Sequence, residues 1–404
     1  VFWLLVYVFV NLTSVLYLGA LAIKTIMGVD LLIGIVGLAL FSALYSLYGG
    51  LKAVAWTDVV QVVFLIFGGL ITTYLALEAV GAGAGVWAGF QRLLESAPEK
   101  FDMIFAQDAT YVDIQTGETK SAYSLLPGIW VLIGGMWIAN LNYWGCNQYI
   151  IQRALAAKSL GEAQKGVAFA GYLKLLLPLI VVIPGIAAFV LDAPIGKADE
   201  AYPWLLSEFV GPGIKGLAFA ALIAAVVSSL SSMVNSTATI FTMDLYKPFI
   251  NRNASEGNLV TTGRIVSASA LVIAGLVAPQ LANIEQAFQF IQDFTGLISP
   301  GVVAIFILGL FWKRTTANAA LAGAVISIPL SLLFNQIIPN MAFLNRMGVV
   351  FLVICAIMIA ISIAQGDKEN AKAIDIDSNL FRTDMVFNIA AIGILGITAA
   401  LYAL

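Results

Sequence analysis

Three residues that can supply oxygen ligands, Ala225, Ser228 and Ser229, lie close together in an apolar stretch of the chain. In a helix the two serine hydroxyls share a face with the backbone carbonyl of Ala225, because they follow it at three and four residues. Neutral oxygens can hold sodium, although a second set of oxygens, usually from an unwound helix, is still needed. The alternative is close helix packing, in which each serine hydroxyl bonds back to a carbonyl one turn earlier.

Asn140 and Tyr143 form a second polar group, and their spacing places them on one helix face. The Gly134-Gly135 pair before them suits an interrupted helix, whose freed backbone groups can bind a ligand. An amide bonds hydroxyls and an aromatic ring covers a C–H face, so together they suit a sugar. A packing kink beside an interfacial aromatic belt is the alternative.

Lys174, Gln292 and Phe288 are further candidates within apolar spans. Lys174 lies roughly 12 Å deep, where its ammonium group either snorkels to the surface or bonds substrate hydroxyls. Gln292 shares a helix face with Phe288, and an amide framed by aromatic rings again resembles a sugar pocket. In the alternative interpretation, this polar half of the span lies outside the bilayer.

Asp58 follows a Gly-Gly pair at 49–50, which predicts a turn. An acid at the following helix start fits an N-terminal cap that the helix dipole favours. A position on a cation exit route is the alternative role.

These polar residues belong to a chain of 404 residues that is 61% hydrophobic and 11% charged. A soluble domain carries about 25% charged residues, so lipid must surround most of this chain. Apolar runs of about 18 residues or more predict eleven membrane-spanning helices. They lie near 1–23, 31–50, 58–81, 126–150, 166–191, 213–234, 259–281, 284–312, 318–338, 347–365 and 383–404. Runs of this length exclude a β-barrel, so the expected fold class is an all-α polytopic membrane protein.

Loop charges orient the spans, because twelve Lys and Arg residues fall on one side and seven on the other, and the richer side is predicted to be cytoplasmic. The long loop at 82–125 then lies outside. Within it, Trp87, Phe90, Leu93 and Leu94 recur at helical spacing and predict an amphipathic helix. This helix lies either at the membrane interface or packed on the ends of the spans.

Other classes of function find little support in the sequence. The chain has no histidine, which excludes a His-ligated metal site, and its net charge of −3 gives no sign of a nucleic-acid partner. No pair of catalytic carboxylates lies within the spans, so an enzyme is not expected. Cys146 and Cys355 lie in apolar spans and are expected to be free thiols.

Taken together, these segments resemble the sodium–solute symporter family, and in particular its bacterial galactose-transporting members. The resemblance runs from Val1 to Leu404. The strings that carry it are NLTSVLYLG at 11–19, WTDVVQ at 56–61, NQYIIQR at 147–153, NSTATIFTMD at 235–244 and FTGL at 294–297.

The resemblance implies a five-plus-five inverted-repeat, amino-acid-permease-like transporter fold. Extra C-terminal helices are expected, and about three N-terminal helices are expected to be missing, without which the chain should not transport by itself. The expected organisation is the rest of the first repeat at 1–81, an extracytoplasmic loop with an interfacial helix at 82–125, the second repeat at 126–312 and additional helices at 313–404.

The resemblance also implies roles for the candidate residues. It implies sodium binding at Ala225, Ser228 and Ser229, sugar bonds from Asn140, Lys174 and Gln292, an inner gate at Tyr143 that stacks on the sugar, and an outer gate at Phe288. Asp58 remains a candidate for the cation exit path. Asn142 and Cys146 depart from the family pattern, since aromatic residues stand there in the galactose-transporting relative.

We therefore predict a secondary active transporter that couples sodium to the uptake of a galactose- or glucose-type sugar by alternating access. A sodium symporter for another small solute, such as myo-inositol or proline, is the alternative. Sodium is expected as a co-transported ion rather than a tightly bound cofactor. The expected partners are the sugar, sodium and the lipid bilayer, and the expected state is a monomer or weak dimer in the bacterial inner membrane.

Overall fold

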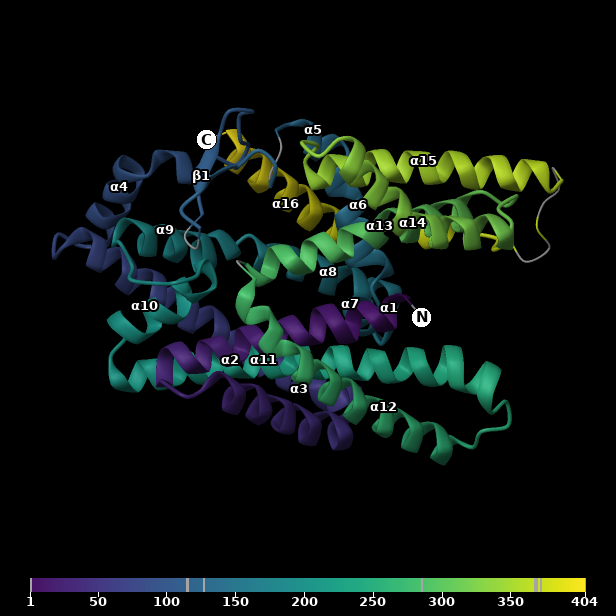
Figure 1. Cartoon of the computed structure of the whole chain (residues 1–404), viewed down its shortest axis with the longest axis horizontal. Coiled ribbons are helices and arrows are strands. Elements are labelled where there is room, and N and C mark those ends of the chain that lie inside the picture. The colour runs from purple at the N-terminus through teal and green to yellow at the C-terminus, as the bar shows by residue number, and fades with distance from the viewer. Residues whose placement is uncertain are drawn as a thin grey trace. The chain divides into compact units, whose positions relative to one another are not determined.

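The chain is mostly helical (Figure 1) in the computed structural model, which describes all residues except 1, 114–115, 126–127, 285, 367–369, 371–372 and 404. The side chains at 2, 45, 47–55, 57, 130, 133, 378, 380 and 403 are also outside the description. Contacts between residues divide the chain into two compact units. The first is Val1–Phe101 with Leu173–Ile291, and the second is Asp102–Tyr172 with Gln292–Leu404.

The described residues of the first unit form eight α-helices, which short 3-10 and π-helical segments join. Its helices are α1 (Phe2–Leu5), α2 (Thr13–Met27), α3 (Leu31–Gly81), α4 (Val86–Ser96), α9 (Ile183–Val190), α10 (Ala201–Phe209), α11 (Pro212–Ile240) and α12 (Glu256–Val277). The other segments are η1 (Val6–Leu12), η2 (Pro98–Lys100), η4 (Pro178–Val182), η5 (Ala198–Glu200), η6 (Phe241–Ile250) and η7 (Ala278–Asn283).

The second unit contains a hairpin and the C-terminal helices. The hairpin pairs β1 (Thr110–Val112) antiparallel with β2 (Thr119–Ser121) in the long loop. The helical segments are α5 (Trp130–Ile133), α6 (Gly135–Leu141), η3 (Asn142–Cys146), α7 (Gln148–Leu155), α14 (Ala317–Ile337), α15 (Phe343–Ala364), η8 (Ser378–Phe381) and α16 (Met385–Ala403). Two helices, α8 (Leu160–Lys174) and α13 (Ala287–Phe311), run from one unit into the other.

Nine helical segments in the described part of the chain are long and apolar enough to cross a membrane, against eleven predicted. One difference is the predicted span at 126–150, which the structure divides among α5, α6, η3 and α7. The other is at 31–50, where the shorter apolar stretch Leu31–Leu44 belongs to the same continuous helix as the span Asp58–Gly81.

The predicted Gly-Gly turn at 49–50 was wrong, because α3 stays helical through both glycines. A glycine in a helix interior costs only about 0.5–1 kcal/mol relative to alanine, and no proline interrupts α3. Asp58 therefore lies inside a helix, and the expectation that it caps a helix N-terminus was also wrong.

The core of the first unit brings α2, α3 and α11 into close contact. A methyl group added to Gly19 of α2 would lie 2.6 Å from Cγ1 of Val226 in α11 and 2.8 Å from Cδ1 of Leu38 in α3. Small residues at such points let helices in a membrane approach closely. This packing holds the serine-rich part of α11 beside α3.

The amphipathic segment predicted in the long loop is α4, and it packs on the end of α3. Leu93 is fully buried in an apolar cluster with Leu77 of α3 and Ile186 of α9, whereas Trp87 is 69% exposed. The Arg92 guanidinium also donates a 2.7 Å hydrogen bond to the carbonyl of Val80. Of the two alternatives for this segment, the structure shows the helix packed on a span end.

The start of α13 is held by the loop at 192–200. The Lys197 ammonium donates hydrogen bonds to the carbonyls of Ala282 and Ile284, which precede α13. The Asp199 carboxylate accepts a 2.9 Å hydrogen bond from the amide of Ala287, the first residue of α13, where the helix dipole favours an anion. Burial raises the pKa of the Asp199 carboxyl, while the Ala287 amide and Lys197 oppose that shift. These contacts fix the helix turn that carries Phe288.

Candidate functional site

The serines of α11 face an acid on α3. The Ser228 hydroxyl donates a hydrogen bond to the carboxylate of Asp58, which lies 170 residues earlier in the chain. The Ser229 hydroxyl donates to the carbonyl of Ala225 at 3.0 Å, and all four residues are half-buried. Simple packing would have each serine bond back to its own helix, as Ser229 does. Ser228 departs from this pattern because its hydroxyl reaches another helix.

This cluster combines one carboxylate with three neutral oxygens, namely the two hydroxyls and the Ala225 carbonyl. Charged side chains within membrane spans are costly, and they commonly mark ion pathways. One turn further along α11, the Ser231 hydroxyl is buried with no hydrogen-bond partner in the described part of the chain. The arrangement is chemically suited to a hard monovalent cation, which oxygen ligands hold.

Replacing Ser229 with Ala should raise the sodium concentration for half-maximal transport about tenfold or more. A hydroxyl that contacts a charged group contributes about 1.5–3 kcal/mol, and 1.4 kcal/mol corresponds to tenfold in affinity. The sugar KM at saturating sodium should change little. Both quantities come from uptake into proteoliposomes that contain the full-length protein.

The matched control is Thr239→Val, because the exposed Thr239 hydroxyl also bonds back within α11, to the Asn235 carbonyl at 2.9 Å. This variant should leave the sodium dependence unchanged. Equal losses of sodium and sugar affinity in Ser229→Ala would contradict the cation assignment.

The break in the helix near Asn140 is present in the structure. α5 ends at Ile133, α6 begins at Gly135, and the chain then forms the π-helical turn η3. The Asn140 side chain is exposed, and its amide nitrogen donates to the Met136 carbonyl at 2.9 Å, so its carbonyl oxygen is available to accept from a ligand.

Tyr143 lies in η3 and is 39% exposed. The ring makes edge-to-face contacts with Trp144, at 5.2 Å between centroids, and with Tyr149, at 6.2 Å. These contacts orient the aromatic face that the resemblance assigns to stacking on the sugar.

The remaining candidates lie on two helices. Gln292 is half-buried in the second turn of α13, and Phe288 is 60% exposed in the first turn. Both residues belong to a segment apolar enough to span a membrane, as does Lys174 at the end of α8, whose side chain is exposed.

The structure brings together only some of the predicted site residues. Asp58, Ala225, Ser228 and Ser229 form one cluster in the first unit, which also contains Lys174 and Phe288. Asn140, Tyr143 and Gln292 belong to the second unit. The convergence of the sugar candidates from both units stays a prediction.

Comparison with known proteins decides the family. The model of the "Sodium:solute symporter family" matches residues 1–327. The chain belongs to the sodium:solute symporter family. It is 50% identical, over its whole length, to a sodium/glucose cotransporter of Vibrio parahaemolyticus, of which it covers 76%. It is also 35% identical to sodium/myo-inositol cotransporter 2 of Mus musculus, with 82% of this chain aligned. The chain spans about half, 51%, of the length of that relative.

A solved structure shows the same fold. The substrate-bound, outward-open Na+-coupled sialic acid symporter matches with a TM-score of 0.74 at 21% identity, covering 92% of this chain and 75% of that one. The predicted inverted-repeat transporter fold is thereby confirmed. As a member of this family, the chain is a multi-pass membrane protein and a sodium-coupled symporter. Sodium is the co-transported ion. Its family and relatives are transporters and not enzymes.

Proposed function

We propose that the protein carries a galactose- or glucose-type sugar into the cell together with sodium. The observation that carries the sugar assignment is the 50% identity with a sodium/glucose cotransporter along the whole chain. The exposed amide of Asn140 and the ring of Tyr143, which follows three residues later and packs against Trp144, support it. We further propose the bacterial inner membrane as the location, and a monomer or weak dimer as the working state.

In this proposal each candidate residue has a defined role. Ala225, Ser228 and Ser229 bind sodium, and Asp58 receives the ion on its way to the cytoplasm. Asn140, Lys174 and Gln292 bond sugar hydroxyls, Tyr143 stacks on the sugar as the inner gate, and Phe288 forms part of the outer gate. The contact between Ser228 and Asp58 supports a path from the binding cluster to the exit residue.

Transport proceeds by alternating access between two repeats, the first ending at residue 81 and the second at 126–312, with residues 313–404 outside the repeats. Sodium binds first from outside and the sugar follows. One charge moving through 100 mV supplies about 2.3 kcal/mol, and a tenfold sodium gradient adds about 1.4 kcal/mol. With one sodium per sugar, the sum of about 3.7 kcal/mol supports roughly 500-fold accumulation.

Uptake of labelled sugars into proteoliposomes containing the full-length protein tests this proposal. We expect saturable uptake of galactose or glucose that requires an inward sodium gradient. Counterflow with labelled myo-inositol and proline tests the alternative substrates. Myo-inositol is the second candidate, because the chain is 35% identical to a sodium/myo-inositol cotransporter. Preference for either solute over both hexoses would overturn the sugar assignment.

Replacing Gln292 with Ala should raise the sugar KM about tenfold, because the loss of one or two hydrogen bonds costs about 1–2 kcal/mol. The sodium half-saturation should stay within twofold, since the sodium cluster lies on α3 and α11. The exposed Gln280 in η7 provides a control, and Gln280→Ala should transport normally. An unchanged sugar KM in a well-expressed Gln292→Ala protein would remove Gln292 from the site.

A further inference from the structure

Helix α15 lies directly against α6, the helix that carries Asn140. A methyl group added to Gly135 of α6 would lie 1.8 Å from the carbonyl oxygen of Leu344 and 2.4 Å from its carbonyl carbon. A methyl added to Gly348, one turn further along α15, would lie 3.4 Å from the Gly135 nitrogen. The two backbones therefore meet with no side chain between them.

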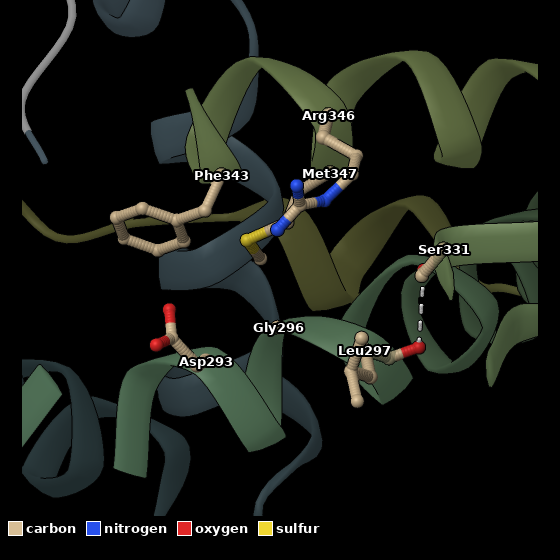
Figure 2. A pocket seen from close by; sticks show the side chains of 7 residues that line it. All are labelled: Asp293, Gly296, Leu297, Ser331, Phe343, Arg346 and Met347. Carbon is tan, nitrogen blue, oxygen red and sulfur yellow. Dashed lines mark hydrogen bonds between the residues drawn. The ribbon is translucent and has the colours of Figure 1, made fainter. Parts of the chain in front are cut away.

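The same part of α15 lies against α13, the helix that carries Gln292. A methyl added to Gly296 would lie 3.3 Å from the sulfur of Met347 and 3.9 Å from Cδ2 of Phe343. In Figure 2 the side chains of Phe343 and Met347 extend from α15 toward the turn of α13 that contains Asp293 and Gly296. The Met347 side chain is 4% exposed, so it fills the space between these helices.

Apolar packing joins α15 to α6 and α13 at this point, and α5 takes part as well. Val131, Ile138, Val303, Leu344 and Met347 form one buried cluster, with members from α5, α6, α13 and α15. The cavity beside it has a volume of about 10 Å³, which is room for one water molecule. Its lining residues are Asp293, Gly296, Leu297, Ser331, Phe343, Arg346 and Met347 (Figure 2). A junction with so little free space transmits any change in side-chain volume to the helices around it.

The junction lies close to the proposed sugar residues along both helices. Gly296 follows Gln292 by one helical turn on the same face, and Gly135 precedes Asn140 in the same short helix. The contacting residues of α15 lie beyond residue 327, where the match to the family model ends. The part of α15 that contacts both helices is thus outside the region that the family model matches.

We propose that residues 343–348 of α15 are a spacer that sets the distance between Asn140 and Gln292, and thereby the size of sugar accepted. The positioning residues are Met347 in the spacer and the two glycines that it and its neighbours face, Gly135 in α6 and Gly296 in α13. None of them touches the sugar, and each acts by setting how closely the helices approach. The spacer rests on the proposed sugar site.

The test uses Gly296→Ala, because its added methyl meets the end of a flexible side chain and the fold should survive. With the added methyl 3.3 Å from the Met347 sulfur, that sulfur or the α13 backbone must move by a few tenths of an ångström. We expect the sugar KM to rise about fivefold or more, with an altered preference between a hexose and a smaller pentose. The sodium half-saturation should stay within twofold and kcat within threefold. Combining Gly296→Ala with Met347→Val, which shortens the opposing side chain, should restore the sugar KM.

Gly309→Ala is the matched control, since it lies on α13 and its added methyl would meet no atom within 4 Å. It should transport like the unmodified protein. If Gly296→Ala matches this control, or if its sugar and sodium constants change together, the spacer is overturned. Measuring Asn140→Ala and Gln292→Ala in parallel distinguishes a wrong sugar site from a wrong spacer. If both leave the sugar KM unchanged, the sugar site is wrong and the spacer with it. If they raise it and Gly296→Ala does not, only the spacer is wrong.

Discussion

Replacing Asp58 with Asn should raise the sodium concentration for half-maximal transport at least tenfold. Asp58 accepts a hydrogen bond from Ser228, so its carboxylate lies at the edge of the proposed cation cluster. Two opposite unit charges about 4 Å apart attract by about 4 kcal/mol at an effective dielectric constant of 20. Even a third of that energy corresponds to about tenfold in affinity. Asn keeps the size and the hydrogen bond of Asp but removes the charge, so the variant isolates the electrostatic contribution.

The sodium dependence of sugar uptake in proteoliposomes measures this effect, and Asp58→Glu, which keeps the charge, should lose less than Asp58→Asn. Asp244 offers a matched control because it is an exposed acid in η6, which follows α11 directly. Asp244→Asn should leave the sodium dependence unchanged. A normal sodium half-saturation in Asp58→Asn would show that the carboxylate does not interact with the transported ion.

The membrane class and most spans were predictable, because they depend on summed hydrophobicity over about 20 residues. Breaks in the helices were harder to predict, and the two errors differ in kind. One predicted turn is absent, and one predicted span is divided into short helices. Gly49 and Gly50 were interpreted as a turn, yet the helix continues through them. At Gly134 the expected interruption is present, but it divides the segment into helices too short to span a membrane separately. A glycine pair permits a break, while the packing around it decides whether a break forms.

Local groupings in the candidate site were also predictable, since helical spacing places Ser228 and Ser229 beside Ala225. The contact of Ser228 with Asp58 was not, because it joins two helices 170 residues apart in the chain. The only feature of the sequence that pointed to this contact was Asp58 itself, a single acid at the edge of an apolar span. The α15 spacer had no signal at all. Gly135 and Met347 resemble ordinary residues of a membrane helix, and their importance depends on which backbone lies opposite.

Replacing Tyr143 with Ala should raise the sugar KM at least tenfold, whereas Tyr143→Phe should change it by less than threefold. A ring that covers about 50 Å² of apolar sugar surface contributes about 1.3 kcal/mol at 25 cal/mol per Å². Phe keeps this surface, and it also keeps the edge-to-face contacts with Trp144 and Tyr149, each worth about 0.5–1.5 kcal/mol, that orient the ring. Ala loses both contributions at once.

Initial rates of sodium-driven sugar uptake over a range of sugar concentrations give the KM of each variant. Tyr74 supplies the control, because it is a 54% exposed tyrosine in α3, and Tyr74→Ala should transport normally. An inner gate must also close the path from the sugar site to the cytoplasm until the transporter changes conformation. Tyr143→Ala should therefore leak preloaded sugar without sodium, and Tyr143→Phe should not. If Phe were as damaging as Ala, the hydroxyl would be the essential group, and the residue would bind the sugar by hydrogen bonding instead of stacking.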